Sequence, residues 1–338
     1  MRRPKSACGC SIIWVSDDEP EDTMPNKHLR HPEDSVLHGR KVVWETLREL
    51  VKATRLSVKW DGAPAIVWGT NPANGKFFVG TKSVFNKRRV KINYTVDDIG
   101  RNHKGPVADI LKLCLEYLPR TDRIIQGDWI GVGLQGTSYQ PNTVEYRFRE
   151  EIQQKIVVAP HTEYTEVTPE AEAKIGVTLE STEDCYFVDT NNASIKPPLG
   201  WRHLIPFIIP VWKMKAPAPK KSYNYYVMEI SKHINSYVCV YNAEDLTPEQ
   251  MYNELDDKYK GEVTLYTFKV WFMILELKQR LLDAIVVDGD VECLIDGTPS
   301  NHEGFVICSD NPYKIVDRWG FSKANFNNLD RNWSYEEV

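Results

Sequence analysis

Apolar positions recur at helical spacing in three parts of the chain, and each stripe predicts a helix. The first stripe, over residues 43–51, precedes a short strand-like run that ends at Lys59. The second predicts a helix over 107–118 that ends at a proline. The third is the long apolar run 265–282. A shorter helix is predicted to start at Thr247, where the sequence Thr-Pro-Glu-Gln combines an N-cap residue with a capping-box glutamine.

Strands are predicted where short apolar runs are bounded by turn residues. Residues 65–69 and 76–80 flank Thr70-Asn71-Pro72-Ala73-Asn74-Gly75, a sequence that favours a hairpin turn. Alternating or continuous apolar runs predict further strands over 123–130, 144–148, 156–158, 186–188, 291–295, 304–307 and 313–316. The predicted strands therefore lie on both sides of a stretch that is mainly helical.

These elements predict an α+β protein, with antiparallel sheets flanked by helices, whose main domain is built from two separate parts of the chain. We assign residues 36–190 and 290–325 to this domain, because most of the predicted strands lie there. Residues 195–285 are predicted to form a mainly helical insertion or subdomain. Residues 1–35 are acidic, contain several prolines and lack periodicity, so we expect a mobile leader. Residues 326–338 are interpreted as a tail.

Composition narrows the class of protein. A hydrophobic content of 42% in 338 residues is enough for a sizeable core, so a disordered protein is not expected. The formal net charge of −5 argues against a protein that binds nucleic acid through its overall charge. The basic run Lys82–Lys91 remains as a local contact for phosphate, with a solvated surface as the alternative interpretation.

Cysteine usage and the length of the apolar runs bear on location. The seven cysteines include no C-x-x-C pair, so free thiols in a reducing compartment are expected. The apolar run 12–15 is too short for a signal peptide, and no stretch approaches the length of a membrane span. We therefore expect a cytoplasmic protein, in the host cytoplasm if the protein is viral, without a membrane partner.

Lys59 is the clearest candidate for a catalytic residue. It lies at the end of a predicted strand and is followed by Asp61 and Gly62, so the backbone there can turn sharply and a phosphate can come close. Burial and nearby positive charge at such a position would lower the pKa of the amine and make it a nucleophile. The alternative is an exposed lysine before a hairpin turn, because K-x-D-G alone is a short motif.

Three further fragments carry polar residues at predicted strand ends. In chain order, the four fragments are Lys59-Trp60-Asp61-Gly62, Gln126-Gly127-Asp128-Trp129, His302-Glu303-Gly304-Phe305-Val306 and Tyr313-Lys314-Ile315-Val316. Their order resembles that of the motifs of the covalent nucleotidyltransferases, the superfamily of ATP-dependent DNA and RNA ligases and mRNA capping enzymes. In that superfamily the motifs are K-x-D-G, a strand with a glycine and an acid, E-G-x-V, and a strand with a lysine.

The resemblance covers about residues 36–160 and 290–325 and leaves the helical stretch between them uncovered. The flanking segments 63–65 and 77–83 are most similar to those of the RNA ligases of large-genome phages. The resemblance implies the nucleotidyltransferase fold, an ATP-grasp-like ligase fold of antiparallel sheets. It also implies ATP as the nucleotide and Mg²⁺ or Mn²⁺ as the metal.

The resemblance further implies a role for each matching residue. Lys59 would attack the α-phosphate of ATP, expel pyrophosphate and form a lysyl-AMP phosphoramidate. Lys314 would contact the same phosphate, and Glu303 would hold the metal. Asp128 would lie near the ribose or a metal-bound water. The family usually reads lysine-x-lysine at the last motif, but Val316 stands at the second position here, so either Arg318 substitutes for that lysine or Lys314 acts alone.

Other residues are expected to border the nucleotide. Asp61 and Gly62 follow the nucleophile, and Lys82 stands where relatives have a basic residue that faces phosphate, with an ordinary surface lysine as the alternative. Tyr146 is our choice for the aromatic ring that stacks on adenine, with Phe148 as the alternative, although Tyr146 is almost as well explained as a core residue. His103 and His161 are interpreted as structural, with contact of His161 to nucleotide or RNA as a lesser alternative.

The sequence therefore predicts an ATP-dependent polynucleotide ligase that acts on RNA. AMP would pass to a 5′-phosphate end, and a 3′-hydroxyl would then displace it and seal the strand. The preference for RNA rests on the resemblance and on the short sequence after Lys314, which leaves no room for the β-barrel that DNA ligases and capping enzymes have there. The alternatives are a DNA ligase or nick-sealing enzyme, and a catalytically impaired nucleic-acid-binding protein with the ligase fold.

Overall fold

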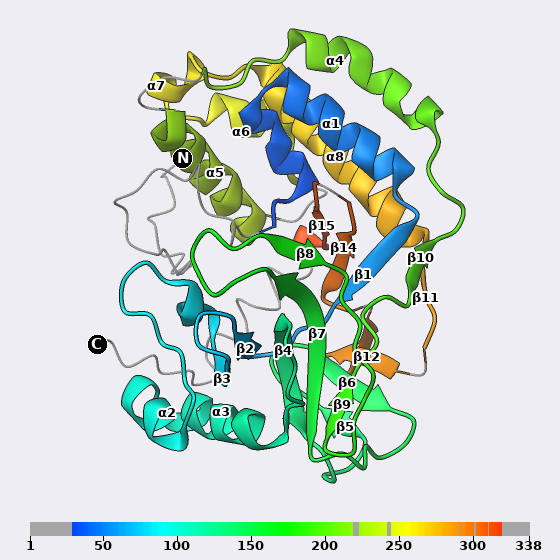
Figure 1. The fold of residues 1–338 in the computed structure, drawn as a ribbon. Helices are drawn as coiled ribbons and strands as arrows, with labels where there is room; N and C mark the ends of the chain where they lie inside the picture. The colour runs from blue at the N-terminus through cyan, green and yellow to red at the C-terminus, as the bar shows by residue number, and fades with distance from the viewer. Residues whose placement is uncertain are drawn as a thin grey trace.

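The computed structural model describes residues 29–218, 223–241, 245–289, 291–300, 302–309 and 311–319. In this part of the chain the protein is a mixed α+β structure with three β-sheets. Most helices gather at one end of the molecule, a pair of helices lies at the other end, and the sheets lie between them (Figure 1). The predicted α+β class, with antiparallel sheets and flanking helices, is confirmed.

The five-stranded sheet brings together strands that are far apart in the sequence. Its order is β11-β10-β1-β14-β15, and all its pairs are antiparallel. The register aligns Lys59 with Gly304 and Val306 with Lys314. The strands are β1 (Arg55–Lys59), β10 (Ala193–Ile195), β11 (Ile285–Val287), β14 (Gly304–Ile307) and β15 (Lys314–Ile315).

The six-stranded sheet contains the predicted hairpin. Its path is β3-β2-β4-β7-β8, and β9 runs parallel to β7 at the side. The strands are β2 (Ala65–Asn71), β3 (Lys76–Gly80), β4 (Ile124–Val132), β7 (Ile156–Tyr164), β8 (Ala173–Ile175) and β9 (Cys185–Phe187). The short 3-10 helix η3 (Lys82–Phe85) follows β3. One face of the sheet packs on α2 (Val96–Asn102) and α3 (Gly105–Tyr117), where Trp68 and Leu111 are fully buried.

The third sheet has four short strands in the order β13-β12-β6-β5. They are β5 (Ser138–Tyr139), β6 (Glu145–Phe148), β12 (Val291–Ile295) and β13 (Thr298–Ser300). The central pair joins the two separate parts of the chain, since Tyr146 of β6 stands opposite Cys293 of β12. Both side chains are buried in the main hydrophobic core.

The segment between β10 and β11 is helical and leaves and rejoins the same sheet. Ile195 and Ile285, at the two ends of the segment, are register partners. Its longest helix is α8 (Leu265–Asp283). This helix packs on α4, on α6 and on the 3-10 helix η2 (Pro32–His38), and it also contacts α1. The helices at this end are η2 (Pro32–His38), α1 (Arg40–Lys52), η4 (Trp201–Phe207), α4 (Ile208–Lys213), α5 (Tyr223–Val240), α6 (Pro248–Asn253), α7 (Asp257–Lys260) and α8 (Leu265–Asp283).

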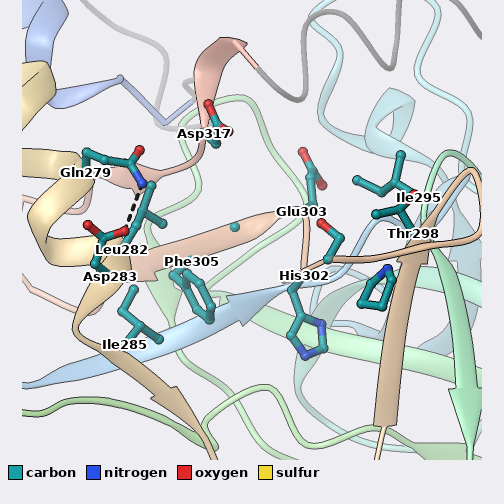
Figure 2. A pocket seen from close by; sticks show the side chains of 13 residues that line it. Gln279, Leu282, Asp283, Ile285, Ile295, Thr298, His302, Glu303, Phe305 and Asp317 are labelled. Atoms are coloured by element: carbon teal, nitrogen blue, oxygen red, sulfur yellow. Dashed lines mark hydrogen bonds between the residues drawn. The ribbon is translucent and has the colours of Figure 1, made fainter.

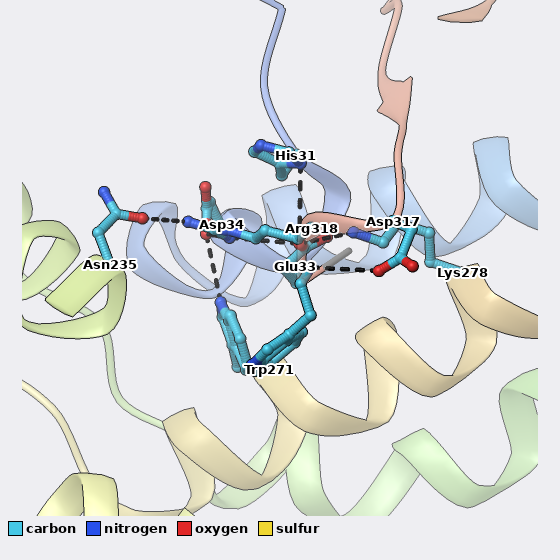
Figure 3. Close-up of polar contacts among 9 residues, drawn as sticks. His31, Glu33, Asp34, Asn235, Trp271, Lys278, Asp317 and Arg318 are labelled. Atoms are coloured by element: carbon cyan, nitrogen blue, oxygen red, sulfur yellow. Dashed lines mark hydrogen bonds and ion pairs between the residues drawn. The ribbon is translucent and has the colours of Figure 1, made fainter. Parts of the chain in front are cut away.

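The prediction of a mobile leader up to residue 35 is wrong for residues 29–35. Pro32 opens the helix η2, and Glu33 in it is fully buried. Its carboxylate accepts hydrogen bonds from Lys278 and Arg318, at 2.7 and 3.2 Å, and Figure 3 shows these three side chains meeting between η2, α8 and the segment after β15. The remaining residues of the predicted leader, 1–28, and the predicted tail lie outside the described residues.

Two further findings concern the helices and the cysteines of the described part of the chain. No helix there combines the length and the apolar character needed to cross a membrane. Cys114, Cys185, Cys293 and Cys308 are free thiols, whereas Cys8 and Cys10 lie outside the described residues.

Candidate functional site

A cavity of about 660 Å³ opens between the five-stranded and the six-stranded sheets. This volume lies within the range of small-molecule sites in proteins, roughly 300–1,000 Å³. Four residues that the sequence singled out line it: Lys59, Lys82, Asp128 and Lys314. We call this space the lysine cavity.

Strand pairing places the first group of functional side chains. Lys59 is the last residue of β1, and Glu303 comes just before β14, the strand paired with it. The Glu303 carboxylate consequently accepts a hydrogen bond from the Lys59 ammonium. Lys314, on β15, stands opposite Val306 one strand further along. Three of the four sequence fragments therefore meet on neighbouring strands.

The fourth fragment reaches the cavity from the other sheet. Asp128 lies on β4 opposite Ala65, just beyond the turn that follows Lys59. That turn packs directly on β4, where the Ala63 amide donates to the Trp129 carbonyl at 3.0 Å. A Cβ atom on Gly62 would lie 2.6 Å from the Asp128 Cβ and 2.7 Å from the Trp129 carbonyl oxygen. Gly62 therefore permits the close approach of the turn to the strand that carries Asp128, although it does not itself line the cavity.

The remaining two cavity lysines are held in an environment that disfavours their charge. Burial, together with the charge of Lys59, lowers the pKa of Lys314. Partial desolvation at the cavity wall and the charge of Lys59 also lower the pKa of Lys82, against an opposing effect of Asp128, although the Lys82 side chain is exposed to solvent. Amines placed in this way are stabilised by an anion that enters the cavity. The cavity is thus suited to a polyanion such as a nucleoside triphosphate.

The prediction of a lowered pKa at Lys59 is wrong for the free protein. Burial does lower the pKa of this amine, but the carboxylates of Glu303, Asp128 and Asp61 together raise it above the ordinary value. Glu303 is itself perturbed, because burial and the nearby acids raise the pKa of its carboxyl to about 7 despite the opposing charge of Lys59. In the free protein, Lys59 is therefore an ammonium paired with Glu303 rather than a ready nucleophile.

Asp61 has a structural task that the sequence did not reveal. Its buried carboxylate accepts hydrogen bonds from the Asn142 side chain and from the amides of Thr143 and Val144, at 2.9, 2.7 and 2.9 Å. These contacts fix the loop that leads into β6. Asp61 is not among the residues that line the lysine cavity, and its expected contact with the nucleotide stays a prediction.

The aromatic residues proposed for adenine lie beneath the site. Tyr146 is fully buried, its hydroxyl accepts a hydrogen bond from the Asp61 amide, and its ring centroid is 4.5 Å from that of Trp60. Phe148 stacks on the same Trp60 at 6.1 Å. Neither side chain lines the cavity, and stacking of either ring on adenine stays a prediction. Tyr146 is a core residue, which was the other reading of this position.

Several cavity residues were missed or undervalued by the sequence interpretation. Trp60 and Val306 line it from the five-stranded sheet and its following turn. His161 lines it from β7, where its Nε2 lies 3.6 Å from an Asp128 carboxylate oxygen and its Nδ1 shares a hydrogen bond with Thr162. A polar side chain that ends an apolar run over 156–159 was the signal for His161. His103 does not line the cavity.

The two residues expected to hold a metal are Glu303 and Asp128. Among the described residues, no group of three or more His, Cys, Asp and Glu is arranged to hold an ion. Glu303 and Asp128 both lie close enough to Lys59 to raise its pKa. Mg²⁺ is usually bound by only one or two carboxylates, with phosphate and water completing its shell. These two acids therefore fit a metal that arrives with a phosphate ligand, rather than a metal held by protein alone.

Arg318 does not take the place of the missing motif lysine. Its guanidinium is buried and donates to Glu33, Asp34 and Asn235, at 3.2, 2.8 and 2.6 Å (Figure 3). It does not line the lysine cavity, and Val316 is buried in the core. Lys314 is therefore the only cation that the last motif contributes to the cavity in the described part of the chain.

Glu303 can also be approached from a second side. A neighbouring cavity of about 470 Å³ is lined by Glu303, Gln279, Asp283 and Asp317 (Figure 2). In the figure, the Glu303 side chain lies between the loop before β14 and the segment that carries Asp317. The Lys59–Glu303 pair thus stands at the border between two cavities of opposite charge.

Comparison with known proteins gives a family but no activity. No curated protein and no solved structure gave a match to the chain. The model of one family, described only as a family of unknown function, matches residues 26–329, which include every fragment discussed above. This match covers most of the sequence, and the protein therefore belongs to the family of unknown function DUF6267.

Proposed function

We propose that this protein is an ATP-dependent RNA ligase with the nucleotidyltransferase fold, and that it works through a lysyl-AMP intermediate on Lys59. The observation that carries the proposal is the convergence of Lys59, Glu303 and Lys314 on three neighbouring strands, with Asp128 and Lys82 facing them from another part of the chain. This set supplies a nucleophilic amine and cations for phosphate in one cavity. It also supplies two carboxylates for a metal, Asp128 on the cavity wall and Glu303 paired with Lys59.

The first reaction would consume ATP. The Lys59 ammonium releases one proton to solvent, and the neutral amine attacks the α-phosphorus. A P–N bond forms as the bond to the bridging oxygen breaks, pyrophosphate leaves with that electron pair, and the nitrogen releases a second proton to solvent. Mg²⁺ bound by Glu303, Asp128 and phosphate oxygens would neutralise charge on the phosphates and on the carboxylates that hold Lys59 protonated. This explains how a lysine with a raised pKa in the free protein can become reactive once its substrate is bound.

The other cavity lysines would orient the phosphates. Lys314 lies on the strand next to β14 and Lys82 follows β3, so they reach the cavity from different sheets. A group held between two fixed cations has its developing negative charge stabilised without movement of the protein. Their lowered pKa values are consistent with side chains placed to meet an anion.

The basic run next to the cavity supports a nucleic acid as the acceptor of AMP. Lys87, Arg88 and Arg89 are exposed and lie a few residues beyond Lys82. Exposed cations at the rim of a reactive site are suited to the phosphate backbone of a polynucleotide. The 5′-phosphate of an RNA end would take AMP from Lys59, and a 3′-hydroxyl would then displace AMP and form the phosphodiester.

A strand-sealing assay tests this proposal. Single-stranded RNA with a labelled 5′-phosphate and a nicked DNA duplex are each incubated with the protein, ATP and Mg²⁺, and the products are separated on a denaturing gel. We expect the RNA to be joined or circularised, and Lys59→Ala to abolish joining. The triple change of Lys87, Arg88 and Arg89 to Gln should reduce sealing while leaving Lys59 adenylylation intact.

Two other outcomes would contradict the proposed RNA substrate or the proposed ligase activity. Sealing of nicked DNA alone would make the protein a DNA ligase. Binding of RNA without transfer of AMP or sealing of either substrate would identify an inactive nucleic-acid-binding protein with this fold.

A further inference from the structure

Outside the proposed active site, the largest gathering of exposed apolar side chains lies on η4 and α4. Trp201, Ile205, Ile208, Ile209 and Trp212 have exposed fractions of 60%, 64%, 56%, 63% and 70%. They occupy positions 201, 205, 208, 209 and 212 of the consecutive helices η4 and α4, and we call these five exposed side chains the apolar ridge. Figure 1 places α4 at the outer edge of the helical end of the molecule, beyond α1.

The opposite face of the same helical segment is also apolar. Leu204, Phe207, Val211 and Met214 are buried in the main core. A surface helix normally carries polar residues on the face turned away from the core, whereas a helix that is apolar on all sides is expected to be covered on all sides. A contiguous exposed ridge of this kind marks an interaction surface rather than ordinary surface variation.

The charge around the apolar ridge indicates what covers it. No Asp or Glu stands between Asp189 and Glu229, although the whole chain has a net charge of −5. The cations in the described part of that interval are Lys196, Arg202, Lys213 and Lys215. Lys213 donates to the Tyr266 hydroxyl and Lys215 to the Gly261 carbonyl, both neutral acceptors, so their charges are not neutralised by these contacts. The partner is therefore expected to be anionic.

The order of residue types along the ridge favours a lipid surface over other anionic partners. The two tryptophans stand at the ends of the ridge and the isoleucines between them, with Arg202 and Lys213 beside the tryptophans. Tryptophan prefers the interfacial region of a bilayer, aliphatic side chains prefer the acyl region, and lysine and arginine bind anionic headgroups. Single-stranded nucleic acid stacks instead on rows of aromatic rings, which the three isoleucines do not provide.

We propose that η4 and α4 dock the protein on the surface of an anionic lipid bilayer, with the apolar ridge inserted at the headgroup boundary. Such docking needs no membrane-spanning helix, because only one face of a helix enters the lipid. It is independent of the proposed ligase activity. It also departs from the expectation of no membrane partner, which was based on the absence of a long apolar run.

Flotation of the full chain with phospholipid vesicles tests the proposal. The vesicles contain either phosphatidylcholine alone or equal parts of phosphatidylcholine and phosphatidylglycerol. We expect the protein to float with the anionic vesicles much more than with the neutral ones, and to be released as salt is raised. Replacing two ridge isoleucines, Ile208→Ser with Ile209→Ser, should lower the partition coefficient about tenfold or more.

Matched variants separate docking from a change in folding. Val90→Ser with Val96→Ser removes two other exposed aliphatic residues, with exposed fractions of 49% and 54%, and should leave flotation unchanged. Lys213→Gln with Lys215→Gln should weaken flotation with anionic vesicles only. Circular dichroism and thermal unfolding of every variant should match the parent protein, because the altered side chains are exposed.

Three results would overturn the proposal. The first is a parent protein that does not float with anionic vesicles, and the second is a ridge variant that floats as well as the parent. In the third, the parent protein does not float but self-associates or binds an oligonucleotide, and the ridge variant loses that property. That result would assign the ridge to a second copy of the chain or to nucleic acid.

Discussion

Catalysis would require Lys59 to lose a proton and Glu303 to be ionised. The surroundings of this pair oppose both changes. Burial and neighbouring acids raise the pKa of the Glu303 carboxyl to about 7, and the acids around Lys59 raise the pKa of its ammonium. Lys82 and Lys314, by contrast, have lowered pKa values. Lys82 and Lys314 are therefore expected to lose their protons at lower pH than Lys59. This order is the opposite of the one expected if Lys59 were an activated amine in the free protein.

We predict this order from the pH dependence of chemical modification. In the free protein, acylation of Lys82 and Lys314 by an amine-reactive reagent should have its pH midpoint below the ordinary lysine value of 10.5, and acylation of Lys59 above it. Glu303→Gln should lower the midpoint at Lys59, because it removes the nearest charge that raises the pKa. Peptide mass spectrometry over a pH series measures all three midpoints. A midpoint at Lys59 below those of both other lysines would contradict the account.

At the scale of elements, the turn after Lys59 and strand β4 are packed without space between them. Gly62 faces the Asp128 side chain and the Trp129 carbonyl, and hydrogen bonds between residues 63–64 and Trp129 tie the turn to the strand. The distance between Lys59 and Asp128 therefore depends on a glycine that does not line the cavity.

A substitution at this glycine should separate the turn from β4. Gly62→Ala places a methyl group where the strand backbone now lies, and overpacking of this kind costs about 1–3 kcal/mol of unfolding free energy. We expect this loss in urea unfolding, together with weaker binding of ATP. Gly100→Ala is the matched control, since no atom lies within 4 Å of the added Cβ and the residue is inside α2. Equal stability of the two variants would show that the turn has room to adjust.

Local patterns predicted the elements whose partners are near in sequence or whose stripe is long. The stripe over 43–51 became α1, the run 265–282 became α8, and the hairpin β2–β3 formed as its turn residues indicated. The helix η2 was missed because its acidic residue Glu33 is buried only through Lys278 and Arg318, which lie far away in the chain. No local pattern could reveal that compensation.

The candidate site was predictable to a similar extent. Motif order identified Lys59, Asp128 and Lys314, which line one cavity, and Glu303, which pairs with Lys59. The alternation over 144–148 correctly indicated a strand at Tyr146, but alternation does not say whether an inward side chain meets a ligand or the core. The hydrogen bonds of the Asp61 carboxylate were not predicted for a related reason, because its partners at 142–144 lie on a loop whose path the sequence does not reveal.

At the scale of the whole molecule, one buried ion cluster joins the N-terminal helix, the helical segment and the end of the motif strands. Glu33 and Asp34 of η2 meet Lys278 of α8 and Arg318, which follows β15 (Figure 3). Two acids and two bases balance in charge, and Lys314 lies only four residues before Arg318. The cluster therefore links the position of the strand with Lys314 to the packing of helices at one end of the molecule.

Removing one member of this cluster should be costly. Lys278→Met leaves the fully buried Glu33 with less compensation, and loss of one partner of a buried pair typically costs about 3–5 kcal/mol. Thermal or urea unfolding should show this loss. Lys269→Met is the control on the same helix, because Lys269 pairs with Glu249 at the surface and should contribute nothing measurable. Similar stability of both variants would show that the cluster does not hold these elements together.

Covalent labelling with ATP shows whether Lys59 carries AMP. The full chain is incubated with Mg²⁺ and ATP labelled at the α-phosphate, separated on a denaturing gel, and digested for peptide mass mapping. We predict one AMP on Lys59, through a bond that acid breaks and alkali does not; no label from γ-labelled ATP; loss of labelling in Lys59→Arg; and retention of Lys59 as the labelled residue in Lys82→Arg. No label, or AMP attached to another residue, would contradict the account.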